Sequence, residues 1–470
     1  MTIERNESPW LAPRRMSGLR DLARAAYHNT AFRLGVLAFV VYNANLRSIT
    51  SADTNPTRYL PISILKEWNL DLDEFDFLQE YPRGAPLKER RPAQYVQHVR
   101  GHYMSTYPVM PAILAVPVYA VPVALGLTEG GSDRGGLTRT EVVGTLLSKI
   151  SASAYVALSV ALVYLTLLRF ADRRTALAIA LLYAFATSSW SVSAQGLWQT
   201  AASQPMLALA LYCLVRAREA PRVAAYAGIP LAISVASKPP TIMFAAVFTF
   251  YVLWRHRDQF VRFLIAPAIV GALLVAYNHY FFGNLMGGYE DLNTRSLFTL
   301  PRLANLAGLL VSPSRGMLVF SPVLVFALGG LGIALVRRRD ALLSAIAVAS
   351  LLFLLFYSSW QNWPGAFSFS YRHMVDLLPG LCLLLVPAYQ WAMAVRWRKG
   401  AFVALTAGSV LAQVIGCFYY PCGWYATPVS ANLDRRRYWD WSDPELLRCL
   451  RAGPVEPDGV VFIRGLLRGD

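Results

Sequence analysis

Asp53 is the first residue of the chain that could do chemistry. It stands a few residues after the first long apolar block, at the expected membrane surface. A carboxylate at such a surface is partly desolvated, which makes it a better acceptor for a proton. The sequence Asp-Thr-Asn-Pro is also good turn chemistry, so a plain turn residue is the alternative. We therefore take Asp53 as the candidate general base.

Arg372 is the leading candidate for binding an anion. It follows the aromatic-rich segment SSWQNWPGAFSFSY and precedes another apolar block. The fork of a guanidinium matches the oxygens of a phosphate group. Asp376 lies four residues later, so on an α-helix it would share a face with Arg372 and orient it. An interfacial salt bridge or a lipid headgroup contact is the simpler alternative.

Two further cations stand in short polar segments. Arg315 follows Ser314 in VSPSRGM, and Lys238 lies in SVASKPP. Hydroxyls, one arginine and the backbone amides of a helix start together predict an anion site. We expect Arg372, Arg315, Lys238 and Ser314 to contribute to phosphate binding.

Aromatic and amide side chains could bind a neutral polar ligand such as a sugar. Gln195, Trp198 and Gln199 lie in SAQGLWQTAAS, a turn without charge. They could stack on a sugar ring and form hydrogen bonds with its hydroxyls, although membrane anchoring explains Trp198 equally well. The other candidates for contact with sugar or acceptor are Arg58, Tyr59, Trp363, Tyr371 and His373.

The composition determines which elements must position these residues. The 470-residue chain is 55% hydrophobic and only 15% charged, against about 25% charged in a soluble domain. So few charges could not cover several soluble globules, and so many apolar residues exclude a disordered chain. The apolar blocks are about 20 residues long, enough to cross a bilayer. The sequence predicts an all-α polytopic membrane protein.

The arginines predict its orientation, because cytoplasmic loops retain Lys and Arg. We place residues 1–33 in the cytoplasm, 34–418 in the membrane domain and 419–470 outside as a tail. The block 107–126 holds four prolines, which we expect to break a membrane helix. If this block does not cross, residues 51–143 form a long first outside loop with interfacial or re-entrant helices. The chain then has about 11 transmembrane helices, and its basic turns lie on the cytoplasmic side.

Several function classes are excluded. The sequence has no Walker A, GxSxG or HExxH motif and no Cys/His cluster with metal-site spacing. The net charge of +16 is explained by topology, so nucleic acid is not an expected partner. In the tail, Cys422 and Cys449 could be disulfide-bonded or both free, and the acidic run Asp71 to Asp76 is typical of a solvated turn.

In order and spacing, five segments resemble the GT-C membrane glycosyltransferases, in particular bacterial relatives of protein O-mannosyltransferases and aminoarabinose transferases. These segments are SADTNPTRYLPISILKEWNLDLDEF, YMSTYPVMPAILAVPVYAVP, WSVSAQGLWQTAASQP, GLLVSPSRGMLVFSPVLVFAL and WPGAFSFSYRHMVDLLPGLCLLL. The resemblance implies a polyprenyl-phosphate-linked sugar donor and a glycan, lipid or protein acceptor. It also implies inverting transfer at the outer face of a bacterial inner membrane, with Asp53 as the base.

The chain departs from the family pattern beside Asp53. Many members have a paired acid there, whereas the neighbours here are Ala52, Thr54 and Asn55. No cofactor is therefore certain: a divalent cation is possible by resemblance, and its ligands are unknown. Where many relatives have a histidine, this chain has Gln199.

Three other functions compete with a transferase that uses single sugars. The plainest is a non-catalytic membrane scaffold, whose function would not change when Asp53 and Arg372 are mutated. An oligosaccharide ligase or polymerase would use similar lipid-linked donors. A transporter or flippase of lipid-linked sugars usually has internal repeats and charged or broken helices at the membrane midplane. The centres of the predicted spans here are nearly free of charge, and the charges stand in the loops. This pattern favours surface chemistry over translocation.

Overall fold

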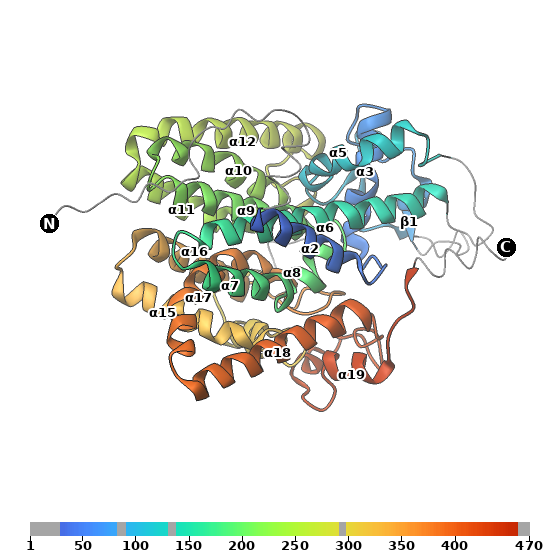
Figure 1. Ribbon diagram of the computed structural model, residues 1–470. Coiled ribbons are helices and arrows are strands. Elements are labelled where there is room, and N and C mark those ends of the chain that lie inside the picture. Colours follow the sequence, from blue (N-terminus) through green and yellow to red (C-terminus); the bar gives the residue numbers. More distant parts are fainter. Residues whose placement is uncertain (1–28, 82–90, 130–137, 291–297, 459–470) are drawn as a thin grey trace.

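The computed structural model describes residues 29–81, 91–129, 138–290 and 298–458. Most of the predicted cytoplasmic segment, residues 1–28, and the last residues of the tail, 459–470, lie outside this part. The described chain is almost entirely helical, and its helices pack side by side in one bundle (Figure 1). The prediction of an all-α polytopic membrane protein is confirmed.

Five helical segments of the described chain are long and apolar enough to cross a membrane. They are Arg139–Leu167 (α6), Arg257–Phe282 (η5 and α12), Ala341–Ser358 (α16), Arg372–Met393 (η9 and α17) and Arg396–Phe418 (α18). Shorter helices pack among them: α2 Thr30–Asn43, α7 Arg173–Phe185, α8 Ser188–Ser191, α9 Gln199–Arg216, α10 Gly228–Ser237, α11 Ile242–Arg255, α13 Leu303–Val311, α14 Met317–Phe320 and α15 Val325–Arg337. The predicted number of crossings and the domain limits stay predictions.

Local sequence explains where several long helices begin. Thr138 and Glu141 form a reciprocal capping box at the start of α6, with the Glu141 side chain accepting from the Thr138 amide at 2.7 Å. Asp172 caps α7 and Asp340 caps α16 through backbone amides of their first turns. These caps satisfy amides that have no partner inside the helix.

The proline-rich block forms one continuous helix, α5 Met110–Ala124, although the sequence predicted repeated breaks. Pro111 stands in the first turn, where its missing N–H is not needed. Pro117 and Pro122 lie inside the helix, and the Tyr155 hydroxyl donates to the Leu114 carbonyl in the turn before Pro117. The helix is only about 22 Å long, shorter than the roughly 30 Å hydrocarbon core.

The segment 51–129 contains α5, a short helix η1 Ala52–Thr54, and helices α3 Asn55–Lys66 and α4 Asp76–Gln79. Two antiparallel pairs complete it: β1 Glu80–Tyr81 with β2 Arg91–Pro92, and β3 Val96–Val99 with β4 His102–Ser105. Helices α3, α4 and α5 and strand β3 contribute to a small hydrophobic cluster that includes Tyr59, Phe75 and Tyr119. The other, larger cluster lies between the long helices.

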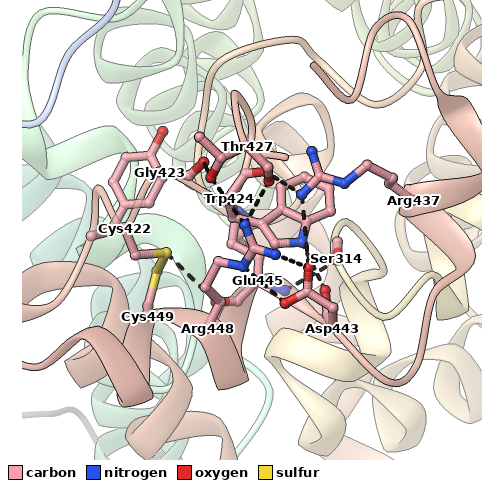
Figure 2. The surroundings of a disulfide bond; sticks show 12 residues. Ser314, Cys422, Gly423, Trp424, Thr427, Arg437, Asp443, Glu445, Arg448 and Cys449 are labelled. Atoms are coloured by element: carbon pink, nitrogen blue, oxygen red, sulfur yellow. Dashed lines mark hydrogen bonds and ion pairs between the residues drawn. A yellow bond between two sulfur atoms is a disulfide. The ribbon is translucent and has the colours of Figure 1, made fainter. Parts of the chain in front are cut away.

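The tail 419–458 contains η10 Arg435–Trp439 and α19 Glu445–Ala452, and α19 packs against α18. Cys422 and Cys449 form a disulfide, which the sequence had left open (Figure 2). Trp424 is buried, and its ring nitrogen donates to the Asp443 carbonyl at 2.8 Å. Glu445, at the start of α19, is fully buried and pairs with Arg315 at 2.6 Å.

Arg315 is the anchor of this tail. Its side chain is only 2% exposed. Besides Glu445, the guanidinium donates to the carbonyls of Ser314, Pro364 and Ala366. It also lies over the ring of Trp424, 5.1 Å from the centroid. A buried guanidinium needs such a complete set of partners to offset its lost hydration.

We predict that Arg315→Met strongly destabilises the protein, by about 3–5 kcal/mol, because it leaves the Glu445 carboxylate buried and unpaired. The midpoint of thermal unfolding in detergent measures this effect. The double variant Arg315→Met with Glu445→Leu should regain most of the loss. The exposed arginine of the Arg436–Asp434 pair provides the control, and Arg436→Met should leave the midpoint unchanged. A single Arg315 variant as stable as the wild type would contradict the anchoring role.

Candidate active site

Asp53 lies in η1, in the connection between α2 and α3. The Ser51 hydroxyl donates to one oxygen of its carboxylate. The other oxygen accepts from Nη1 of Arg372 at 2.8 Å. The side chains of Asp53 and Arg372 are 19% and 14% exposed, so this ion pair is only partly buried. The structure thus joins the candidate base to the candidate phosphate ligand directly.

Trp198 forms a platform beneath this ion pair. The Arg372 guanidinium lies over its ring, 4.9 Å from the centroid. The ring nitrogen of Trp198 donates to the carbonyl of Ile49 at 3.1 Å, which holds the ring in place. A flat aromatic face keeps a guanidinium positioned while its N–H groups remain able to exchange partners.

Two tyrosines that the sequence did not single out lie close to this pair. The ring centroids of Tyr107 and Tyr289 are 6.0 Å apart. Burial raises the pKa of Tyr107 to about 12, and the nearby Asp53 carboxylate adds to this rise. The Tyr289 hydroxyl accepts from the Gln199 side chain at 2.5 Å. Both phenols are half-buried, and the Tyr107 phenol is protonated at neutral pH.

Glycines make the approach of these two tyrosines possible. An added Cβ at Gly288 would lie 2.6 Å from the Cα of Thr106, the residue before Tyr107. Gly287 has a positive φ of +62°. The pair Gly287–Gly288 is the sequence signal that could have pointed to a close approach of two chain segments here. It could not have indicated which segment was approached.

The expected pairing of Arg372 with Asp376 is corrected by the structure. Both residues lie in η9 Arg372–Leu377, a 3₁₀-helix with three residues per turn, so positions four apart do not share a face. The Asp376 carboxylate instead accepts from Lys238 at 2.5 Å and from the Ser203 hydroxyl at 2.5 Å. The ammonium of Lys238 also donates to the His373 carbonyl at 3.2 Å.

Lys238 is therefore buried beneath the segment that carries Arg372. Its side chain is 5% exposed, and that of Asp376 is not exposed at all. The ammonium also lies 5.7 and 5.6 Å from the ring centroids of Phe353 and Tyr357. This arrangement, like that of Arg315, is typical of a cation that fixes its surroundings. Lys238 and Arg315 are thus satisfied within the protein.

Gln195 is buried as well, in a polar network that fixes the turn before α9. Its side-chain oxygen accepts from Lys149 and from Asn45, both at 2.7 Å, and its amide donates to the Trp190 carbonyl. Lys149 also donates to the carbonyls of Tyr42 and Ala194. This network holds the segment that leads into Trp198 and Gln199.

The other candidates for ligand contact are distributed more widely. Arg58 donates to the Thr50 hydroxyl at 2.7 Å, and Tyr59 is buried in the small hydrophobic cluster. The Tyr371 hydroxyl shares a hydrogen bond with Ser321 at 2.6 Å inside the bundle. Trp363 packs against Tyr438 of the tail, and the Ser314 hydroxyl accepts from the Glu445 amide. The structure thus gathers Asp53, Arg372, Trp198 and Gln199 around one place.

His373 is mostly buried beside Arg372. Its ring stacks on Tyr357 with centroids 4.9 Å apart and meets the edge of Trp360 at 5.1 Å. Gly365 lies against it, because a Cβ there would be 2.8 Å from the Nε2 of His373 and 3.5 Å from the Nε of Arg372. Gly365 also has a positive φ of +80°.

One group within the described residues could hold a metal ion: Asp71, Asp73 and His102, whose ligand atoms lie within 4.8 Å of one another. The Nδ1 of His102 is 2.7 Å from Asp73 and 3.4 Å from Asp71. The hydrogen bond to Asp73 raises the pKa of His102, and burial raises that of Asp71. Two carboxylates with an imidazole are a donor set that suits a divalent transition metal. The sequence indicated only an acidic turn here, because His102 comes from β4.

No protein-family model matches the chain, and no curated protein matches it. Among solved structures, ArnT from Cupriavidus metallidurans, bound to undecaprenyl phosphate, is 12% identical over 85% of this chain and 76% of its own, with a TM-score of 0.48. The Archaeoglobus fulgidus oligosaccharyltransferase, tethered with an acceptor peptide, is 13% identical over 88% of this chain, with a TM-score of 0.49. This chain covers 59% of that protein. Both are GT-C membrane glycosyltransferases, the family that the sequence resembles.

We predict that Gly365→Ala lowers the midpoint of thermal unfolding, with a loss of about 1–3 kcal/mol of stability. The reason is that a side chain at this positive φ is strained and would also meet the His373 ring. The matched control is Gly400→Ala, because nothing lies within 4 Å of a Cβ added there. The control should be as stable as the wild type or slightly more so. Equal effects of both changes would show that the Gly365–His373 contact is unimportant.

Proposed function

We propose that the protein transfers a sugar from a polyprenyl-phosphate donor to an acceptor hydroxyl at the outer face of a bacterial inner membrane. The observation that carries the proposal is the partly exposed ion pair of Asp53 and Arg372. In this proposal the pair supplies a proton acceptor and a phosphate ligand that lie next to each other. The surrounding Trp198, Gln199, Tyr107 and Tyr289 offer the stacking faces and hydrogen-bonding groups that sugars require.

The chemistry requires no nucleotide, because a sugar phosphate ester already has a good leaving group. The acceptor oxygen forms a bond to the anomeric carbon while the bond from that carbon to the phosphate oxygen breaks. Asp53 takes the proton of the acceptor hydroxyl. Arg372 offsets the negative charge that develops on the departing polyprenyl phosphate. Attack opposite the leaving group inverts the configuration at the anomeric carbon.

This mechanism requires the ion pair to open when the donor binds. Asp53 and Arg372 are in contact, whereas a base and a leaving phosphate lie on opposite sides of the anomeric carbon. We infer that the donor phosphate replaces the Asp53 carboxylate as the partner of Arg372. This exchange would free Asp53 for the acceptor at the moment the donor is present. Trp198 keeps the guanidinium in position during the exchange.

Arg372 is the phosphate ligand in this proposal, and the two other cations support it. Lys238 binds the carbonyl of His373, and Arg315 binds those of Pro364 and Ala366, on either side of Arg372 in the chain. Each oxygen of the Asp53 carboxylate already accepts a hydrogen bond, one from Ser51 and one from Arg372. The donor set of Asp71, Asp73 and His102 fits a divalent cation, and no step of the proposed reaction passes through it.

We predict that Asp53→Asn retains donor binding but lowers turnover about 10²–10⁴-fold, because it removes the general base. Purified protein in lipid nanodiscs is assayed with a panel of polyprenyl-phosphate sugars, for binding and for transfer to added acceptors. Asp434→Asn, at a partly exposed carboxylate of the tail, is the matched control and should retain full activity. Unchanged turnover in Asp53→Asn would exclude Asp53 as the base.

We predict that Arg372→Ala loses donor binding, whereas Arg372→Lys keeps part of it, because an ammonium retains the charge without the fork. Equilibrium binding of the same donors and of the free polyprenyl phosphate measures this loss. Arg436→Ala, a change at an exposed arginine of the tail, should bind the donors as the wild type does.

The same preparations separate a transferase from a transporter. If wild type and Asp53→Asn alike bind the donors and move them across vesicle membranes, the protein is a transporter and the transferase proposal fails.

A further inference from the structure

An open pocket of about 500 Å³ lies far from the Asp53–Arg372 pair, and we call it the basic pocket. Its lining comes from the end of α9, the end of α11 and the turn between α15 and α16. The lining residues are Ala217, Arg218, Pro221, Tyr251, Arg255, His256, Asp258, Arg339, Asp340, Ala341 and Leu342.

Helix α9 separates this pocket from the candidate active site. Gln199, at its first residue, contacts Tyr289 of that site, and Arg218 lies two residues beyond its last. Eighteen residues of α-helix span about 27 Å, close to the thickness of the hydrocarbon core. In Figure 1 the labels of α3 and α5 lie at one side of the bundle, and those of α11 and α15 at the other. The basic pocket is therefore on the predicted cytoplasmic side.

Two arginines of the pocket have no carboxylate partner among the described residues. Arg255 lies by the ring of the neighbouring Trp254, 5.9 Å from the centroid, and Arg339 stands in the exposed turn before α16. The third, Arg218, pairs with Asp340 at 2.7 Å. Arg218 also lies over the Phe170 ring, which fixes it in the pocket wall.

The carboxylates of the pocket do not cancel these two charges. Asp340 is occupied by Arg218 and by the amides of Leu342 and Leu343 at the start of α16. Asp258 accepts from the Gln259 side chain at 2.6 Å and is the one remaining acid. Two unpaired guanidiniums thus face one carboxylate, in a hollow that also holds the buried ring of His256. Guanidinium forks in a concave site suit the oxygens of a phosphate group.

The neighbouring surface indicates where such a phosphate would come from. Trp254, which precedes Arg255, is 63% exposed, and Phe250 and Val261 on the adjoining helices are 67% and 75% exposed. Only 6% of the apolar window of η5–α12 is buried, so this helix faces lipid along most of its length. Exposed tryptophan beside arginine at the end of a membrane helix is typical of headgroup depth. The basic pocket therefore borders lipid headgroups.

We propose that the basic pocket binds a phosphate group, presented in the membrane by the headgroup of an anionic lipid of the cytoplasmic leaflet. Basic hollows between helices on this side of a membrane recognise such headgroups. The lipid would bridge the α11–α12 turn and the α15–α16 turn through Arg255 and Arg339. It would add a link between these two turns on the predicted cytoplasmic side.

The test compares two double variants. The pocket variant carries Arg255→Gln and Arg339→Gln, and the matched control carries Arg257→Gln and Arg337→Gln. The control removes the same charge from the same two turns but from residues that do not line the pocket. The full chain is reconstituted with spin-labelled phosphatidylglycerol or phosphatidylcholine, and electron paramagnetic resonance measures the protein's preference for the first. We expect the pocket variant to lose about 25-fold of this preference, since each of the two arginines that contact the bound headgroup contributes about fivefold. The control should lose far less.

A second measurement separates a lipid from a soluble phosphate. Inorganic phosphate is titrated into the protein in neutral detergent, and the midpoint of thermal unfolding is followed for wild type and both variants. Phosphate could raise the unfolding midpoint of the wild type and the control but not that of the pocket variant, while the pocket variant keeps the lipid preference of the wild type. This result would support the phosphate site but assign it to a soluble ligand, and it would overturn the assignment to a lipid. Equal lipid preference and equal phosphate response in wild type, pocket variant and control would overturn the proposal. Transfer activity is not part of this test, so its failure leaves the proposed function untouched.

Discussion

The ion pair between Asp53 and Arg372 joins two segments that are 319 residues apart in the chain, and the candidate site exists only because they meet. A partly buried guanidinium is stabilised by an anionic partner, because its loss of hydration is costly. Here the partner is a carboxylate that is itself partly exposed. Exposed ion pairs are weak, and we propose that this one exchanges a partner when the donor binds. A fully buried pair would not allow that exchange.

Two buried ion pairs hold the surroundings of this exchangeable one. Arg315 with Glu445 fixes the chain at Pro364 and Ala366, and Lys238 with Asp376 fixes it at His373. The segment between these points carries Arg372. A charge that is buried with a complete set of partners acts as a permanent anchor, because breaking it leaves an uncompensated ion. The protein thus uses its cations in two ways, according to their burial.

A buried polar network without a carboxylate fixes the chain segment that carries Trp198. Lys149, Gln195 and Asn45 are buried together and bond to one another through the Gln195 side chain. They also donate to backbone carbonyls of α2, of the turn before α9 and of α18. Such a network specifies one arrangement of the chain when its members are satisfied. The aromatic platform under Arg372 is therefore set before any ligand arrives, which is the preorganisation that transfer chemistry needs.

The sequence by itself determined the class of protein and the kinds of side chain at its site. Composition and apolar block length require membrane helices, whatever their packing, because hydrophobic burial in lipid depends on residue type and length alone. The positions of Asp53 and Arg372 beside apolar blocks also sufficed to single them out. The tertiary structure decided which charges pair. Spacing along one helix predicted an ion pair between Arg372 and Asp376. In the structure, the 3₁₀ turn and the packing of distant segments pair Arg372 with Asp53 and Asp376 with Lys238 instead. Tyr107 and Tyr289 were missed for the same reason, since a contact between loops depends on how helices pack and leaves no periodic signal in either segment.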